Sequence, residues 1–279
     1  MKITEIYGKE EGIKKGKIDR KNGLSHFTLN KRGRIVADVF YLNSFSNPVI
    51  IIPGAGCNDE KKRVIISKFK FLIRENFSLI FYNYPDLNIF SFSDNDFFNY
   101  IKRCVEEIRG VIKTIENSSS FSIIGMSLGG IIGLITTGVE EKIEKSVILI
   151  SGGNFEIITW KGFLRFKLKK DCSRIACKNM HKVYKKLLDK KMYDEILKLP
   201  RKCFLYDPLT FKEFLKNKKI LMINGLFDFI IPPLSAFEMK KGMKNIRHIW
   251  CPSTHLSFFF FFPFLKKKIF RFFTNETED

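Results

Sequence analysis

The sequence predicts an α/β fold in which helices flank a mostly parallel central sheet. Short apolar runs alternate with amphipathic stretches along most of the 279 residues, which is the pattern of repeated β-α-β units. The apolar runs are continuous, as expected for strands that are buried on both faces. Hydrophobic residues make up 45% of the chain, so a substantial core is expected, in one domain with an insertion or in two small domains.

The predicted core elements follow one another in a regular order. Strands are expected at Pro48–Ile52, Ser78–Tyr82, Phe121–Ile124, Ser146–Ile150, Lys219–Ile223 and Ile246–Trp250. Helices are expected at Glu60–Glu75, Asp94–Ile115 (capped by Ser93 or Asp94), Leu128–Gly138, Leu234–Lys241, and after His255, where Pro263 kinks or delays the last helix. Ahead of the first of these strands, His26–Leu29 and Arg34–Tyr41 predict a hairpin around the turn at residues 30–33.

The alternation stops between Ile150 and Lys219. The segment Phe155–Leu215 is basic and mostly helical in pattern, and it contains no clear buried strand. A structureless loop of that length would be unusual, so we expect a helical cap that lies over the top of the sheet. The predicted division is a core of residues 1–153 and 217–279 with a cap of residues 154–216.

The formal charge of +20 indicates attraction to nucleic acid, anionic membranes or acidic substrates. Biased composition is the favoured explanation, because Lys, Ile, Phe and Asn are abundant together and the basic residues are spread along the chain, with one denser run over Lys161–Lys191. No RNP, zinc-finger or helix-turn-helix motif accompanies the charge. We therefore expect no specific nucleic-acid partner, and weak association with an anionic membrane surface stays open.

The six cysteines form no CxxC pair, which favours reduced thiols and a cytoplasmic protein. The charged start of the chain does not resemble a signal peptide, and the longest apolar run, Phe258–Leu265, is too short to span a membrane. Walker, GxGxxG and HExxH motifs are absent from the sequence, so neither a cofactor nor a metal is expected.

The strongest chemical signal is the segment Gly125-Met126-Ser127-Leu128-Gly129, which lies between a predicted buried strand and a predicted helix. A sharp turn there would hold the Ser127 hydroxyl at its tip and crowd the residues two before and two after it. Gly125 and Gly129 suit that crowding because they lack a Cβ atom. A glycine-rich turn without chemistry has the same letters, but the flanking strand and helix favour a nucleophilic serine.

This motif resembles the nucleophile elbow of the α/β-hydrolase superfamily, and the resemblance, to an esterase- or lipase-like serine hydrolase, extends from about Arg34 to about Phe273. In that family an acid and then a histidine follow the nucleophile along the chain. The run Gly225-Leu226-Phe227-Asp228, with Pro232 four residues later, is similar to the family's acid turn, so the resemblance implies Asp228 as the acid. It implies His255, in the loop after the last strand, as the base.

The backbone N–H groups of Leu128 and Ala55 are the oxyanion-hole donors that the resemblance implies. Pro53 stands where the family usually has histidine, which leaves Gly56 as an alternative to Ala55. Asp207 is a fallback for the acid, although its position before Pro208 favours a helix cap.

The resemblance implies hydrolysis of a small-molecule carboxylic ester through an acyl-enzyme. A serine peptidase or thioesterase with the same triad, and a non-catalytic binding protein with this fold, remain alternatives. A cysteine nucleophile, Cys57 or Cys251, is disfavoured because neither lies in such a turn. The Phe-rich C-terminus (residues 258–273) is expected to pack on the sheet; contact with an anionic membrane or an acyl pocket is the alternative.

Overall fold

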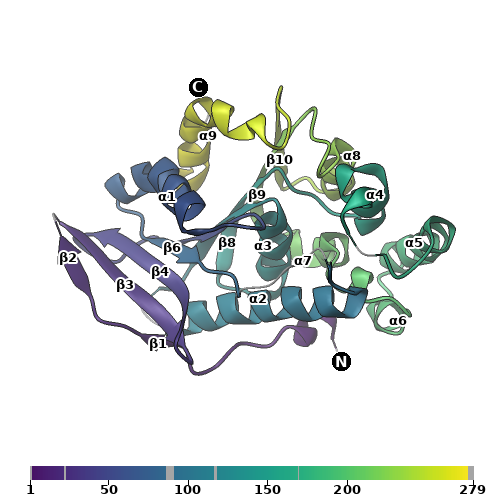
Figure 1. Ribbon diagram of the computed structural model, residues 1–279, viewed down its shortest axis with the longest axis horizontal. Helices are drawn as coiled ribbons and strands as arrows, with labels where there is room; N and C mark the ends of the chain where they lie inside the picture. Colours follow the sequence, from purple (N-terminus) through teal and green to yellow (C-terminus); the bar gives the residue numbers. More distant parts are fainter. Residues whose placement is uncertain (1, 22, 86–90, 116–117, 169, 276–279) are drawn as a thin grey trace.

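The computed structural model describes residues 2–21, 23–85, 91–115, 118–168 and 170–275. Over these ranges ten strands form one sheet, and nine of them follow the order β1-β3-β4-β6-β5-β7-β8-β9-β10, with β2 beside β3 (Figure 1). Positions 1, 22, 86–90, 116–117 and 276–279 of the predicted core, and position 169 of the predicted cap, lie outside the described ranges.

Six strands make the parallel part of the sheet. They are β5 (Val49–Ile52), β6 (Leu79–Tyr82), β7 (Phe121–Met126), β8 (Ile143–Leu149), β9 (Lys219–Gly225) and β10 (Ile246–Cys251). All neighbours in the order β6-β5-β7-β8-β9-β10 pair in parallel, which confirms the predicted sheet. Because parallel strands all point the same way, the loops that follow them gather at one edge.

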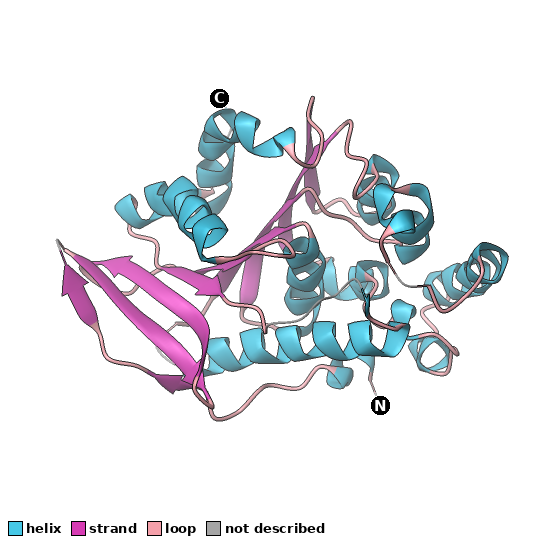
Figure 2. Cartoon of the chain, in the orientation of Figure 1, coloured by secondary structure: helices cyan, strands magenta, loops and turns pink. Residues whose placement is uncertain are grey.

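The antiparallel part of the sheet comes from the N-terminal residues. It contains β1 (Lys14–Lys15), β2 (Asp19–Lys21), β3 (Leu24–Lys31) and β4 (Arg34–Leu42). β3 and β4 form the predicted hairpin, and β4 joins the parallel part through antiparallel pairing with β6. Figure 2 shows this ribbon of strands extending from one side of the molecule.

Helices cover both faces of the sheet (Figures 1 and 2). α1 (Asp59–Arg74) and α9 (Phe262–Thr274) share one apolar cluster with alternate residues of the strands, such as Ile51 and Ile124. α2 (Asp94–Thr114), α3 (Leu128–Val139) and α8 (Pro233–Lys240) share the other, with Ile50 and Ile123. Since adjacent residues of one strand enter different clusters, both faces of these strands are buried, as their continuous apolar runs predict.

Local signals set the ends of two helices. Ser93 caps α2, and its hydroxyl forms a reciprocal capping box with Asp96. Residues Ser257–Phe261 form a 3₁₀ turn (η6), and Pro263 lies in the first turn of α9, where a missing N–H costs least. The expectation that proline delays the last helix is confirmed.

The segment between β8 and β9 contains helices and 3₁₀ turns joined by loops, and no strand among its described residues. It contains α4 (Phe155–Lys161), η3 (Phe163–Phe166), α5 (Arg174–Asp189), α6 (Tyr193–Leu197), η4 (Lys202–Phe204), η5 (Pro208–Phe211) and α7 (Lys212–Leu215). From the sequence, this segment is expected to lie over the top of the sheet, but part of it belongs to the core. η5 and α7 pack against α3, and their apolar side chains, including Phe211 and Leu215, are fully buried. α4 lies against α5 and α8.

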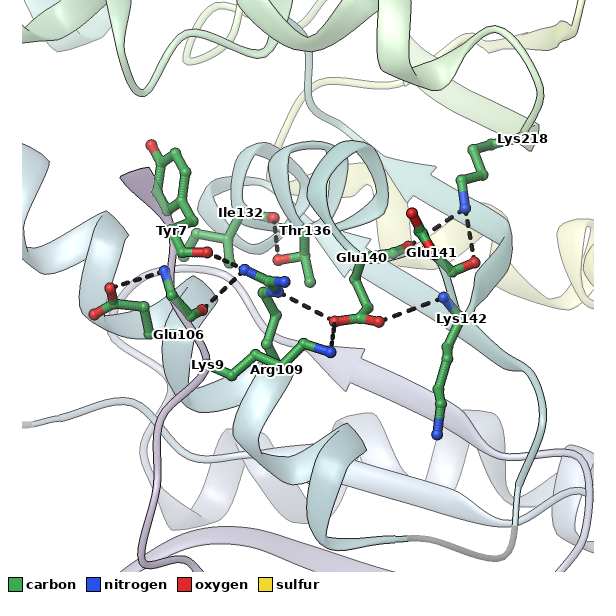
Figure 3. Close-up of polar contacts among 11 residues, drawn as sticks. Tyr7, Lys9, Glu106, Arg109, Ile132, Thr136, Glu140, Glu141, Lys142 and Lys218 are labelled. Carbon is green, nitrogen blue, oxygen red and sulfur yellow. Dashed lines mark hydrogen bonds and ion pairs between the residues drawn. The ribbon is translucent and has the colours of Figure 1, made fainter. Parts of the chain in front are cut away.

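An ionic network ties the N-terminal segment to the core (Figure 3). The guanidinium of Arg109, on α2, donates hydrogen bonds to the backbone carbonyls of Tyr7 and Gly8 and pairs with the carboxylate of Glu140 at 3.1 Å. The ammonium of Lys218 donates to the backbone carbonyl of Glu140 on the opposite side. No helix within the described ranges is long and apolar enough to cross a membrane.

Candidate active site

Ser127 lies in a sharp turn between β7 and α3. Its φ of 54° and ψ of −118° are sterically costly for a residue with a Cβ atom. The turn leaves the side chain partly exposed at the carboxyl edge of the sheet while its neighbours Met126 and Leu128 are buried. A strained backbone thus presents one hydroxyl to the solvent side.

The glycines on either side of Ser127 are required by close backbone contacts. A Cβ atom on Gly125 would lie 2.4 Å from the carbonyl oxygen of Gly129, and one on Gly129 would lie 2.2 Å from that of Ile52. Real Cβ atoms do not approach backbone atoms so closely. The crowding that the sequence motif predicted is present, because the helix starts directly against β5 and β7.

Ser127, His255 and Asp228 form a continuous chain of hydrogen bonds. The Nε2 atom of His255 is 3.0 Å from the Oγ of Ser127, and its Nδ1 atom is 2.7 Å from the Oδ2 of Asp228. Asp228 is 3% exposed, and its second oxygen accepts from the backbone N–H groups of Ile230 and Ile231, each at 2.9 Å. The three residues come from turns after β7, β9 and β10.

Backbone hydrogen bonds join the loop that follows β9 and carries Asp228 (the acid loop) to the loop that follows β10 and carries His255 (the histidine loop). The N–H of Leu226 donates to the carbonyl of Cys251 at 2.8 Å, and the N–H of Phe227 donates to that of Ser253 at 3.0 Å. Parallel pairing of β9 with β10 brings these loops side by side. The separation of 27 residues between Asp228 and His255 therefore becomes direct contact.

The loop after β5 lies beside the nucleophile. A Cβ atom on Gly54 would be 3.4 Å from the Cβ of Ser127, and the hydroxyl of Tyr84 fixes the loop by donating to the carbonyl of Pro53 at 2.6 Å. Ala55 follows in an exposed turn. Its N–H, like that of Leu128 at the start of α3, has no hydrogen-bond partner among the described residues.

The remaining histidines lie outside this chain of hydrogen bonds. His26 pairs with Asp38 in the antiparallel hairpin, at 3.0 Å. The Nε2 of His181 accepts from the N–H of Glu156, and the Nε2 of His248 faces Asn224. Burial lowers the pKa of His181 and of His248 to about 4, so both rings are neutral at pH 7.

Asp207 and the two cysteines have structural surroundings. The buried carboxylate of Asp207 accepts from the N–H groups of Asn154, Phe155 and Leu209, so it caps η5 as expected and also holds the start of α4. Burial raises its pKa to about 6. Burial also raises the pKa of the Cys57 and Cys251 thiols, which disfavours the thiolate that a cysteine nucleophile needs.

Sequence reasoning missed Ser151. Its buried hydroxyl donates to the backbone carbonyl of Ser127 at 2.8 Å, and its own carbonyl accepts from the side chain of Asn224. The signal available in the sequence was a serine directly after a strand that neighbours the nucleophile strand. Within the described residues, no three His, Cys, Asp or Glu side chains cluster as metal ligands would.

Neither a protein-family model nor a curated protein sequence matches the chain. Solved structures do resemble it. An acetyl xylan esterase from Paenibacillus sp. aligns with a TM-score of 0.61 and 13% identity, over 98% of this chain and 90% of that one. An esterase from Pyrococcus furiosus aligns with a TM-score of 0.60 and 13% identity, over 95% and 92%.

An enol-lactonase from Burkholderia xenovorans aligns with a TM-score of 0.54 and 12% identity, over 92% of this chain and all 100% of that one. At such identities the likeness concerns architecture. It agrees with the parallel order of β5 to β10 and with the strand-turn-helix arrangement around Ser127. The chain has the α/β-hydrolase fold.

Proposed function

We propose that the protein is a serine hydrolase that cleaves a carboxylic ester through an acyl-enzyme intermediate. The observation that carries the proposal is the hydrogen-bonded chain from Ser127 through His255 to Asp228, at 3.0 and 2.7 Å. The nucleophile and base are within hydrogen-bonding reach of each other, and a third group orients the base. The solved structures that resemble the chain include esterases and an enol-lactonase, which supports this proposal.

The tautomer of His255 follows from its two partners. Asp228 has no proton to give when ionised, so Nδ1 carries the hydrogen and donates it to the carboxylate. Nε2 then presents its lone pair to the hydroxyl of Ser127. The two N–H groups of Ile230 and Ile231 hold the carboxylate in this orientation.

In the first half-reaction, the Ser127 oxygen attacks the acyl carbon while its proton moves to Nε2 of His255. The negative charge on the former carbonyl oxygen is stabilised by the N–H of Leu128 and by that of Ala55, or of Gly56 in the same turn. The bond to the leaving oxygen then breaks, and Nε2 returns the proton to that oxygen, which departs as an alcohol.

In the second half-reaction, water attacks the acyl-enzyme as His255 takes one of its protons. The bond between the acyl carbon and the Ser127 oxygen breaks, and the serine regains its proton from Nε2. A carboxylic acid is released and the site returns to its initial state. The helical segment at residues 154–216 would select the acyl and leaving groups, because α4 and η3 approach the acid loop: the N–H of Phe163 donates to the carbonyl of Phe229.

A fluorophosphonate probe tests the nucleophile. We expect stoichiometric labelling of the wild type and none of Ser127→Ala, while Ser67→Ala, which changes an exposed serine on α1, labels like the wild type. Absence of labelling of the folded wild type would favour the non-catalytic binding protein. Turnover of p-nitrophenyl esters of increasing chain length, compared with thioesters and peptide substrates, separates an esterase from a thioesterase or peptidase.

A further inference from the structure

Three apolar side chains in the segment that follows His255 are largely exposed. Leu256, Phe260 and Phe264 are 72%, 81% and 77% exposed. Leu256 directly precedes η6, Phe260 lies in η6, and Phe264 lies in the first turn of α9. Their neighbours Phe258 and Phe262 are buried against the sheet. Because the same phenylalanine run supplies both sets, the helix presents one apolar side to the core and a second to solvent.

A second exposed apolar group includes the two neighbours of Asp228 in the sequence. In the acid loop, Phe227 is 65% exposed and Phe229 is also exposed. The ring of Phe163, on η3, lies 6.1 Å from that of Phe229 and 6.2 Å from that of Phe166, which is 68% exposed. Phe163 thus contacts both Phe166 and Phe229, and the Arg165 guanidinium lies 4.4 Å from the centre of the Phe166 ring. All four phenylalanines remain between 43% and 68% exposed.

The two groups belong to one edge of the molecule. The backbone hydrogen bond from Phe227 to Ser253 joins the acid loop to the histidine loop, and Leu256 follows three residues later. Figure 1 shows α9, the loops after β9 and β10, α8 and α4 in succession along the same edge. We call these seven side chains the apolar rim: Phe163, Phe166, Phe227, Phe229, Leu256, Phe260 and Phe264.

Basic residues predominate in two of the segments that carry the apolar rim. Residues 157–170 contain five Lys or Arg and no Asp or Glu, and residues 256–274 contain four and none. In the acid loop, residues 226–232, the one charged residue is Asp228, which is buried. A second copy of this chain would bring like charges together across such a surface, whereas an anionic surface would neutralise them.

From this combination we infer that the apolar rim docks on an anionic lipid bilayer. Exposed aromatic rings insert at the boundary between headgroups and acyl chains, and the flanking lysines and arginines face the negative headgroups. Because Phe227 and Phe229 adjoin Asp228 and Leu256 adjoins His255 in the chain, docking orients the candidate active site toward the lipid. This binding does not require catalysis, so it stands or fails apart from the proposed hydrolase activity.

Vesicle co-sedimentation of the full chain tests the inference, with phosphatidylcholine vesicles compared with vesicles that also contain phosphatidylglycerol, at physiological salt. We expect binding to the anionic vesicles and at least about tenfold weaker binding of Phe260→Ser/Phe264→Ser, since a loss of 1.4 kcal/mol is tenfold. Both side chains are exposed, so the variant should fold, which circular dichroism checks. The matched control Ile175→Ser, at an apolar residue 75% exposed on α5, should bind like the wild type.

Two double variants that each remove two lysines distinguish binding by the apolar rim from attraction by the overall charge of +20. Lys266→Gln/Lys267→Gln should weaken binding several-fold, and Lys182→Gln/Lys186→Gln on α5 should leave it nearly unchanged, although both variants lose two exposed positive charges. Equal loss in the two variants would assign binding to net charge alone and overturn the inference. So would failure to bind anionic vesicles, or a wild-type dimer that Phe260→Ser/Phe264→Ser converts to a monomer.

Discussion

The hydroxyl of Ser151 donates a hydrogen bond of 2.8 Å to the backbone carbonyl of Ser127. It holds the strained turn from the side of β8, where a Cβ on Gly130 would lie 2.4 Å from the Ser151 Cβ. We expect Ser151→Ala to lower kcat for a p-nitrophenyl ester about 2- to 10-fold with little change in KM, because one neutral hydrogen bond contributes about 0.5–1.5 kcal/mol. Ser235→Ala is the control, since that buried hydroxyl has no partner among the described residues. If Ser151→Ala and Ser235→Ala had the same kcat, Ser151 would have no positioning role in the candidate active site.

Asp228 and Asp207 can be separated by matched substitutions. Asp228→Asn should lower kcat by about 10³- to 10⁴-fold, because an amide favours the wrong tautomer of His255, as in other triads. Asp207→Asn should lower the free energy of unfolding while changing kcat by less than about tenfold, because its oxygens hold backbone N–H groups rather than the histidine. Steady-state kinetics and urea denaturation measure both. The opposite pattern of kcat values would make Asp207 the acid.

Two glycines of α3 should respond differently to an added methyl group. Gly129→Ala should cost about 3 kcal/mol or more of unfolding free energy, because its Cβ would meet the backbone oxygen of Ile52 at 2.2 Å. Gly133→Ala meets a side-chain methyl of Ile123 at 3.1 Å, which can shift, and alanine favours the helix by about 0.5–1 kcal/mol. Denaturant midpoints would compare them. Similar stabilities would contradict the close packing of the turn.

His181 should make stability depend on pH. Its pKa is lowered from 6.5 to about 4 in the folded state, so the unfolded chain binds more protons between these values. Stability from this group is therefore present above about pH 6.5 and is lost as the pH falls toward 4, by an amount on the order of 3 kcal/mol. His181→Gln, which can still accept from Glu156, should reduce the slope of unfolding free energy against pH in this window. An unchanged slope would show that His181 is not the titrating group.

The network in Figure 3 should contribute to stability through a buried carboxylate. Arg109→Met removes the guanidinium from Glu140, whose side chain is 3% exposed, and should cost about 3–5 kcal/mol. Lys113 lies on the same helix as Arg109, and Lys113→Met breaks its exposed ion pair with Glu11 in the N-terminal segment. This change should cost less than about 1 kcal/mol. Hydrogen exchange should also show faster opening at Tyr7 in Arg109→Met alone. If the two variants had equal free energies of unfolding, the pair of Arg109 and Glu140 would contribute no more than an exposed ion pair.

Much of the fold was predictable because its signals are local. Continuous apolar runs identified the parallel strands, Ser93 marked the start of α2, and Pro263 marked that of α9. The placement of η5 and α7 was not predictable in this way. Their helical pattern does not say which neighbour covers it, and Phe211 and Leu215 pack against α3 instead of over the sheet edge.

By itself the sequence determined the order and type of the core elements and the residue types of the candidate site. Glycine at positions 125 and 129 and the order Ser127, Asp228, His255 are chemical facts of the chain. Only the tertiary structure decided that these three side chains meet. His255 lies 3.0 Å from Ser127, which is 128 residues away in the sequence, and 2.7 Å from Asp228. They meet because parallel pairing brings the ends of separate strands to one edge. The tertiary structure also decided the partner of Ser151 and the side of the phenylalanine run that faces solvent. Those depend on which surfaces pack together, and no short stretch of sequence contains both partners.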